Sequence, residues 1–495
     1  MRRRARPQCA STRRRGVVDA STDMRSPRRR VSRAPHRRGA RACGALCVVV
    51  VVVLLRIFFS ARRSSDVNAR PGVDALVERV LSPWLARGVS AEAVDAAFEV
   101  NQRQDAACFI VQKFGRALFT VGDADARPNR GKWNPGRLFR TRRQNILRLL
   151  RRAIEIADDI PDFEATFCLH DCVVSQDRNT SHNMFGTQYE FIPDPVAAFT
   201  VVSCVDSMNI PFPTWDYAAG YLRNWDEKWR ELRREARSRE WDARKGQAVF
   251  RGGQRTCVLY PKVGERANGV PFYRVSAKDG ENAKKCGRNA LLYQALSSTS
   301  NHLFDVALTD GVDWRSFGHD ELLRPPNKPR LLNKAEQEAF KYQIIAEGEC
   351  QWANRLRDAL FMGTTLILQD LQCVEYYGLE LKPWKHYIPV DYWFTNLTQA
   401  VVWAENNQQA VKSMNEAKLE YAMQYLTTER IEEFVVKLMR KYAQLLTYSV
   451  VKRSGAVEVD FAQLSSDEAA FDTRSKYSNS FLAWRTWIRC AWIRC

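Results

Sequence analysis

The stretch "LELKPWKHYIPVDYW", Leu379 to Trp393, concentrates side chains that could bind a ligand. It holds two tryptophans, two tyrosines, one histidine and two lysines. A buried strand is more uniformly apolar, and a surface loop is more polar. Trp384, His386 and Tyr387 could therefore pack the loop, contact a nucleotide or order a hinge, and the residue types around them favour packing.

Two glycine-containing segments place arginines where a phosphate group could bind. In "VFRGGQRT", Arg251 and Gly252 end a predicted strand. Glycine allows close approach of the backbone to a ligand, and one arginine side chain can bind two phosphate oxygens at once. In "EGECQWANRLRDALFMG", Gly348 lies in a loop and Arg355 lies on the helix that follows, an arrangement suited to a phosphate at a helix start. Each segment alone is a weak signal, because such arginines are commonly solvated or paired, and neither segment is a GxxxxGK[ST] or GxGxxG loop.

One acidic residue follows a predicted strand and could act as a general base. Asp171 in "CLHDCV" comes just after an apolar run and next to His170. Strand ends are where α/β folds carry reactive groups, and a carboxylate there could take a proton from a hydroxyl. The alternative is that Asp171 caps the next turn.

Other catalytic and metal-binding patterns have little support. The "DAD" at Asp123 to Asp125 has the spacing of a metal-holding DxD, but no apolar strand precedes it. The chain contains no GxSxG, no HExxH and no tight CxxC pair. We therefore expect no metal site.

The elements that carry these residues alternate between strands and helices. Apolar residues at helical spacing predict helices over 137–159 and 397–451, and an amphipathic helical pattern extends from 91 to 120. A long charged helix is predicted over 218–244, with Trp225 and Trp229 as a docking stripe. Apolar runs predict strands, and these runs lie at 163–171, 197–205, 246–252, 302–310, 341–349 and 364–370. This pattern predicts two stacked α/β units followed by a helical C-terminal layer.

The positive charge is concentrated at the N-terminus. The formal net charge is +20, but residues 1–41 contain fifteen arginines against two acids. This basic tail precedes the apolar run 42–59, which approaches the length of a bilayer-spanning helix. The positive-inside rule then predicts a single-pass type II protein with a cytoplasmic tail and a lumenal body. A cleaved signal peptide and an organelle transit peptide remain alternatives.

The thirteen cysteines and two sequons are compatible with a lumenal body. A lumenal compartment allows disulfides, although the spacing does not reveal their pairing. The sequons begin at Asn179 and Asn396 and matter only in that compartment. The repeat "TWIRCAWIRC" at the C-terminus suggests no function.

Several motifs together resemble a known family. "DIPDFEATFCLHD", "IPFPTW", "AVFRGG", "KYQIIAEGECQWANRLRDALFMGTTLIL" and "LKPWKHYIPV" occur in the order found in the CAP10-like, Rumi-type protein O-glucosyltransferases, glycosyltransferase family 90. The resemblance covers roughly Asp159 to Val451. It implies a GT-B arrangement of two Rossmann-like lobes facing across a cleft, UDP-sugar donors, inversion at the anomeric carbon and no divalent metal or other cofactor.

The resemblance also assigns residues. It implies that Asp171 is the catalytic base and that Trp215 of the "PxW" motif lies near the sugar. Arg251, with Gly252 beside it, falls on a donor-diphosphate arginine, and Gly348 and Arg355 fall in the donor-binding loop and helix. His386 falls within the donor-lobe signature "LKPWKHYIPV", and we include it among the donor-binding residues.

Three departures from the family pattern leave the sugar and the acceptor open. Cys172 follows Asp171 where relatives have a proline-containing turn, Asp216 follows Trp215 where Ser or Thr is usual, and Asn354 lies where relatives often have Ser. Single pocket contacts separate glucose from xylose.

The predicted organisation is a basic tail at 1–41, an anchor at 42–59, a stem with helices at 60–120, a glycosyltransferase domain at 121–455 and a tail at 456–495. The predicted partners are a UDP-sugar, a protein or glycan acceptor and the membrane of the endoplasmic reticulum or Golgi, with no nucleic acid. The alternative functions are a catalytically silent glycan- or protein-binding member and, should the tail lie free of the bilayer, nucleic-acid binding through that tail.

Overall fold

The computed structural model describes fourteen stretches of the chain, all within the compact unit Ser64–Cys495. The described residues are 72–104, 108–122, 136–169, 196–204, 208–213, 221–253, 257–259, 273–275, 287–297, 299–309, 329–348, 353, 355–371 and 373–463. The predicted basic tail and anchor, and the residues Asp123, Asp171, Trp215 and Asn179, lie outside them. Within the described stretches no helix combines the length and apolarity needed to cross a bilayer.

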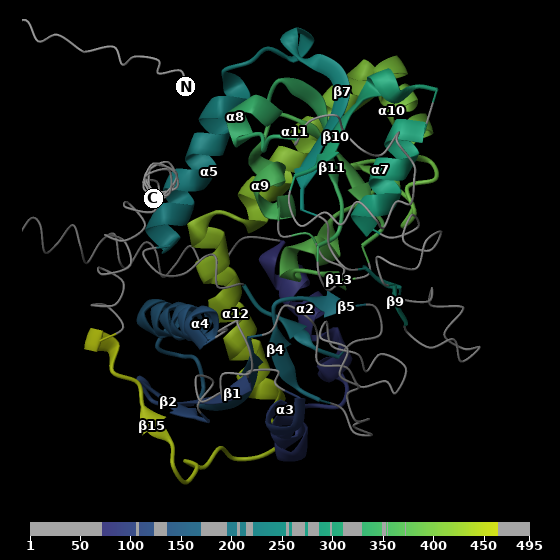
Figure 1. Ribbon diagram of the computed structural model, residues 1–495. Helices are drawn as coiled ribbons and strands as arrows, with labels where there is room; N and C mark the ends of the chain where they lie inside the picture. Colours follow the sequence, from purple (N-terminus) through teal and green to yellow (C-terminus); the bar gives the residue numbers. More distant parts are fainter. Residues whose placement is uncertain are drawn as a thin grey trace, which may run out of the picture. The chain divides into compact units, whose positions relative to one another are not determined.

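One sheet is five-stranded and wholly parallel (Figure 1). Its strands, in spatial order, are β10 (Phe304–Leu308), β7 (Lys245–Gly252), β11 (Phe340–Ile345), β12 (Thr365–Gln369) and β14 (Ile388–Val390). Counted along the chain, this order is 2-1-3-4-5, that of a flavodoxin-like doubly wound sheet. The expected Rossmann-like unit is therefore present in this half of the chain.

Alternating side chains of this sheet enter two hydrophobic clusters. Ile344 and Ile367 belong to one cluster, which includes residues of α7 (Gly287–Ser297) and α10 (Leu397–Asn406). Ile345 and Leu368 belong to the other, together with residues of the helices α5 (Tyr221–Arg237), α9 (Arg355–Phe361) and α12 (Thr428–Leu445). Because side chains alternate along a strand, the sheet is apolar on both faces, as parallel sheets are.

The second sheet is six-stranded and mixed. Its strands, in spatial order, are β15 (Val457–Glu458), β2 (Ala117–Val121), β1 (Cys108–Phe114), β3 (Phe163–Cys168), β4 (Ala198–Thr200) and β6 (Ile210–Pro211). Only the β3–β4 and β4–β6 pairs are parallel. β1 and β2 form an antiparallel hairpin whose two-residue turn is Gly115-Arg116, with a φ of 55° at Gly115. This unit thus departs from the second purely Rossmann-like lobe that the resemblance implies.

The hairpin also corrects the helical pattern expected from 91 to 120. α3 (Ala91–Gln104) is a helix, but β1 and β2 follow it. The first six residues of β1 are all buried, so the strand lacks the polar and apolar alternation that identifies a half-exposed strand.

Helices pack on both faces of the mixed sheet. α2 (Val73–Leu85), α4 (Gly136–Ile156) and α12 share one cluster with Phe109 and Phe167, and Figure 1 shows α4 and α12 beside β1 and β4. α3 lies on the other face, where Ala97 packs with Cys108 and Cys168. The remaining elements are α8 (Lys334–Gln337), α11 (Gln408–Tyr425) and the strand pairs β5 (Ser203–Cys204) with β13 (Cys373–Val374) and β8 (Cys257–Leu259) with β9 (Tyr273–Val275).

The docking stripe predicted for the charged helix is confirmed. Trp225 of α5 is 2% exposed and meets Phe361 of α9 edge-on, and Trp229 stacks on the same ring. The Trp225 indole N–H donates to the carbonyl of Leu426 at 2.7 Å. These contacts bind α5 to the helices beside the parallel sheet.

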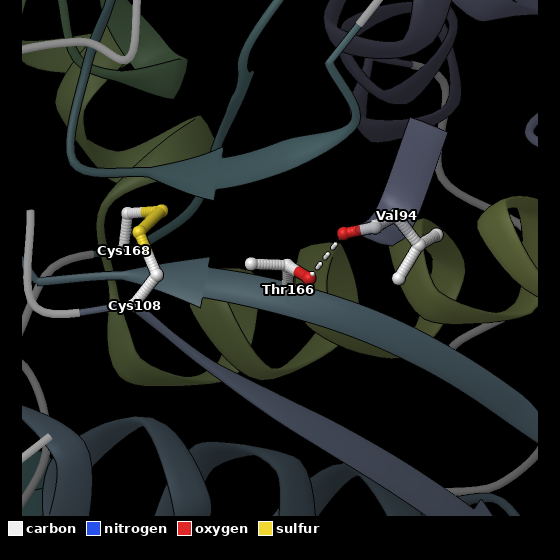
Figure 2. The surroundings of a disulfide bond; sticks show 4 residues. All are labelled: Val94, Cys108, Thr166 and Cys168. Carbon is white, nitrogen blue, oxygen red and sulfur yellow. Dashed lines mark hydrogen bonds between the residues drawn. A yellow bond between two sulfur atoms is a disulfide. The ribbon is translucent and has the colours of Figure 1, made fainter. Parts of the chain in front are cut away.

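A disulfide fastens the carboxyl end of β3 (Figure 2). Cys108 and Cys168 face each other across the antiparallel β1–β3 pair and are joined. On the same strand the Thr166 hydroxyl donates to the carbonyl of Val94 in α3 at 2.9 Å, so strand and helix are linked as well. Both contacts lie just before the segment that contains Asp171.

Candidate functional site

The parallel sheet has one switch point, between β7 and β11. After β7 the chain forms β10 on one side of β7, and it then forms β11 on the other side. In open α/β sheets, ligands bind in the crevice outside the carboxyl ends of the two strands at such a point. Here β7 ends with Arg251 and Gly252 and is followed by Gly253, and Glu347 and Gly348 come shortly after β11.

Two arginines converge on the end of β7. The Arg355 guanidinium donates to the Arg251 carbonyl, and that of Arg288 donates to the Gly253 carbonyl, each at 2.7 Å. A Cβ on Gly252 would lie 2.7 Å from Arg355 Nη2 and 3.3 Å from Arg288 Nη1. Glycine at this position therefore lets two positive charges approach one strand end, and guanidinium groups in pairs suit a diphosphate.

An aromatic ring supports the same arginines. The guanidinium carbons of Arg355 and Arg288 lie 4.6 and 5.7 Å from the centre of the Phe250 ring. Ring faces attract cations, so Phe250 helps to hold both charges at the strand end. Arg355 was predictable from the sequence, whereas Arg288 was not, because its local signal is merely a Gly-Arg pair at a helix start.

The side chain of Arg251 points to a neighbouring strand. It forms an ion pair with the Asp305 carboxylate of β10, and its Nη1 donates to the Asp305 carbonyl at 2.6 Å. What Arg251 offers to the switch point is its backbone carbonyl, the acceptor for Arg355. Its predicted contact with a donor diphosphate stays a prediction.

Glu347 brings an acidic group to the same crevice. Its side chain is 3% exposed, and its Oε1 accepts from the Tyr392 hydroxyl at 2.8 Å. Burial raises the pKa of this carboxyl to about 8, although the Tyr392 hydrogen bond and the Arg288 charge oppose the rise. Sequence analysis did not single out Glu347, whose signal was its place directly before the predicted donor-loop residue Gly348.

His386 lies at the other end of the parallel sheet. It precedes β14, whereas Gly252 and Glu347 are at carboxyl ends. His386 Nδ1 accepts from the backbone N–H of Lys382 at 3.0 Å, and the ring packs 4.7 Å from that of Tyr421. Burial, together with the charges of Lys385 and Lys382, lowers the pKa of His386 to about 4. The packing role is the observed one, and the predicted donor contact stays a prediction.

The mixed sheet has a small, water-sized hollow at the carboxyl ends of its parallel strands. It is lined mainly by aromatic and apolar side chains, among them Phe167, Leu169, Phe199, Phe212 and Pro213, together with Arg142. Asp171 comes two residues after Leu169 and Trp215 two residues after Pro213, and Asp171 and Trp215 lie outside the described residues. Arg142 Nη1 donates to the Leu169 carbonyl at 2.6 Å and so anchors the chain just before Asp171.

Within the described stretches, no group of three or more His, Cys, Asp or Glu side chains is arranged to hold a metal ion. Asp123 to Asp125 lie outside those stretches, but the expectation that no apolar strand precedes them is wrong, because β2 ends at Val121. In the described part of the chain, the structure brings the guanidinium groups of Arg288 and Arg355 and the carboxyl group of Glu347 to the switch point.

Comparison with known proteins gives one family and several relatives. The model of the family described as glycosyl transferase family 90 matches residues 71–259 and 271–483. The O-glucosyltransferase rumi homolog of Aedes aegypti is 23% identical over 277 residues, 54% of this chain and 60% of the relative. Human protein O-glucosyltransferase 3 is 29% identical over 151 residues, 30% of this chain and 28% of the relative. Human protein O-glucosyltransferase 1 is 23% identical over 261 residues, 53% of this chain and 60% of the relative. The chain thus spans less than two thirds of the length of these relatives.

Proposed function

The chain belongs to glycosyltransferase family 90, and from that premise we propose that it is an inverting glycosyltransferase. It moves a sugar, glucose or xylose, from a UDP-sugar to a hydroxyl group of a protein or glycan acceptor. The names of the relatives, which are protein O-glucosyltransferases, support a protein acceptor and a hexose.

The observation that carries the proposal is the convergence of Arg288 and Arg355 on Gly252 at the switch point. Negative charge develops on the diphosphate as UDP leaves. Positive groups that are already fixed beside it stabilise this charge and so lower the activation barrier of transfer. Both guanidinium groups are held by backbone carbonyls and by Phe250 before any donor binds. This arrangement provides for the leaving group without a metal ion in the proposed reaction.

The base is placed in the other half of the chain. In the proposed step, the Asp171 carboxylate takes the proton of the acceptor hydroxyl while the acceptor oxygen forms a bond to the anomeric carbon. The bond from that carbon to the diphosphate oxygen breaks, and UDP leaves with the electron pair. Attack on the face opposite UDP inverts the anomeric centre. Trp215 is proposed to lie beside the sugar, with Gly348 beside the donor.

This chemistry requires the two α/β units to work as donor and acceptor lobes of a GT-B enzyme. The parallel sheet supplies the donor side, and the edge of the mixed sheet after β3 and β6 supplies the acceptor side. The second assignment rests on sequence position, because Asp171 and Trp215 come shortly after β3 and β6.

The proposed location is the membrane of the endoplasmic reticulum or Golgi, in a type II orientation with the body in the lumen. The run 42–59 and the preceding arginines support the anchor. The Cys108–Cys168 disulfide supports an oxidising compartment.

A donor screen tests the proposal. The purified full chain is incubated with UDP-glucose, UDP-xylose and UDP-galactose, and UDP release is measured with and without candidate acceptor domains. Release from at least one donor, stimulated by an acceptor, is expected. A folded protein that releases no UDP from any donor would instead be a catalytically silent binding member of the family.

A further inference from the structure

Glu347 has one carboxylate oxygen that the described part of the chain leaves without a hydrogen-bond partner. Its Oε2 is buried and makes no hydrogen bond there, whereas Oε1 accepts from Tyr392. Buried polar atoms are nearly always paired, so each exception calls for an explanation such as a binding partner that is absent.

The rest of Glu347 is held firmly in place. Its backbone N–H donates to Gln369 Oε1 at 2.8 Å, and the Gln369 amide donates to the Tyr392 carbonyl at 2.8 Å. Gly287, at a φ of 43°, packs so closely that a Cβ there would lie 2.8 Å from Glu347 Oε1. The carboxyl group is therefore fixed on its Oε1 side by Tyr392 and Gly287, and Oε2 remains for a ligand.

The same carboxyl lies beside the proposed diphosphate site. Arg288 connects the two strand ends, since its Nε donates to the Glu347 carbonyl at 2.9 Å and its Nη1 to the Gly253 carbonyl. In a nucleoside diphosphate the ribose is bonded directly to one of the two phosphates. A group adjacent to the phosphate-binding arginines thus meets the ribose, whose hydroxyl groups can donate to a carboxylate or accept from a carboxylic acid.

We propose that Glu347 binds a ribose hydroxyl of the nucleoside diphosphate donor through Oε2 and so selects ribonucleotides. This inference rests on the proposed function and adds a specificity residue to the donor site. The raised pKa of Glu347 is compatible with it, because a hydroxyl group suits either protonation state of the carboxyl.

The test compares UDP, 2′-deoxy-UDP and 3′-deoxy-UDP by calorimetry on the full chain, as wild type, Glu347→Ala and Glu347→Gln. The wild type is expected to bind one deoxynucleotide about threefold to a hundredfold more weakly than UDP, the range from a neutral hydrogen bond to one with a charged group. Glu347→Ala is expected to bind UDP and that deoxynucleotide equally. Glu347→Gln, which keeps the shape and one acceptor oxygen, is expected to discriminate less than the wild type.

A control variant separates ribose binding from support of the fold. Tyr392→Phe removes the partner of Oε1 but leaves Oε2, so it is expected to keep the wild-type discrimination. Thermal unfolding checks that each variant is folded, and Glu347→Gln decides the matter if Glu347→Ala does not fold.

Two results would overturn the inference and leave the proposed function standing: a wild type that binds all three nucleotides equally, or a folded Glu347 variant that discriminates as strongly as the wild type. A wild type that binds no UDP would overturn the proposed function together with the inference.

Discussion

At the scale of single residues, the donor site depends on the absence of a side chain. Gly252 has no Cβ, and this allows Arg355 and Arg288 to reach the carbonyls on either side of it. Adding even one methyl group at Gly252 would displace a guanidinium group, because both groups lie within hydrogen-bond distance of the neighbouring backbone carbonyls.

Gly252→Ala is expected to raise the KM for the donor by about tenfold, which corresponds to about 1.4 kcal/mol of binding free energy. The added Cβ would displace Arg355 Nη2, which lies 2.7 Å from its position. Steady-state kinetics measures the effect. Gly115→Ala is the control: its Cβ would meet nothing within 4 Å, and its φ of 55° makes any cost one of stability. An unchanged KM in folded Gly252→Ala would refute the assignment of these arginines.

The buried His386 is expected to make the stability of the fold depend on pH. Its pKa is about 4 in the fold, against a value near 6.5 in the unfolded chain. Between these values the unfolded state binds the extra proton, so acidification from about pH 6.5 to pH 4 lowers the free energy of unfolding. His386→Asn keeps an acceptor for the Lys382 N–H and removes this titration.

Urea unfolding at pH 7 and pH 4 measures the difference. The wild type is expected to lose about 2 kcal/mol more than His386→Asn on acidification, which is less than the full shift allows. Other groups, such as Asp358, whose pKa is about 2, are common to both proteins and cancel. Parallel losses in the two proteins would show that His386 is not protected from protonation in the fold.

At the scale of elements, strongly patterned segments were predictable and pairing partners were not. Apolar spacing in α4 and uniform apolar runs in β3, β7, β11 and β12 predicted those elements. β1 was missed because its burial removes the alternation that marks a strand. The ion pair of Arg251 with Asp305 was not predictable, because Asp305 lies 54 residues later on a strand whose register no local pattern reveals. The place of Arg288 at the site was not predictable either, because α7 approaches the end of β7 only in the folded chain.

The disulfide is predicted to stabilise the end of β3 and the segment after it. Replacing Cys108 and Cys168 together by Ser is expected to cost about 2–4 kcal/mol of stability. Thermal unfolding without reductant measures the loss. Thr166→Val is the matched control, because Thr166 lies on the same strand as Cys168 and the change removes only its hydrogen bond to Val94 of α3. This change is expected to cost about 1 kcal/mol. Equal stability of the double Ser variant and the wild type would show that the link contributes nothing.

At the scale of the whole molecule, the charge and the apolar run suggest the proposed division of the chain into an anchor and a body. The arginines of residues 1–41 precede the run 42–59, and the described helices and strands begin at Val73. In the proposed topology the basic tail orients the chain in the membrane, and the folded body carries the proposed chemistry.

Deleting residues 1–62 is expected to release the body from the membrane. Expression with a cleavable secretion signal, followed by fractionation in carbonate, measures the distribution. The full chain is expected in the membrane fraction and the truncated chain in the soluble fraction. A truncated body that stays with the membrane would contradict an anchor confined to the N-terminus.

The central claim is that Asp171 takes a proton from the acceptor while the arginines of the other sheet hold UDP. Asp171→Asn in the full chain, compared with the wild type for sugar transfer and for UDP affinity, tests both parts together. The account predicts that transfer falls by at least about a hundredfold, the contribution of a general base, and that the Kd for UDP is unchanged. Normal transfer by the folded variant would contradict the account.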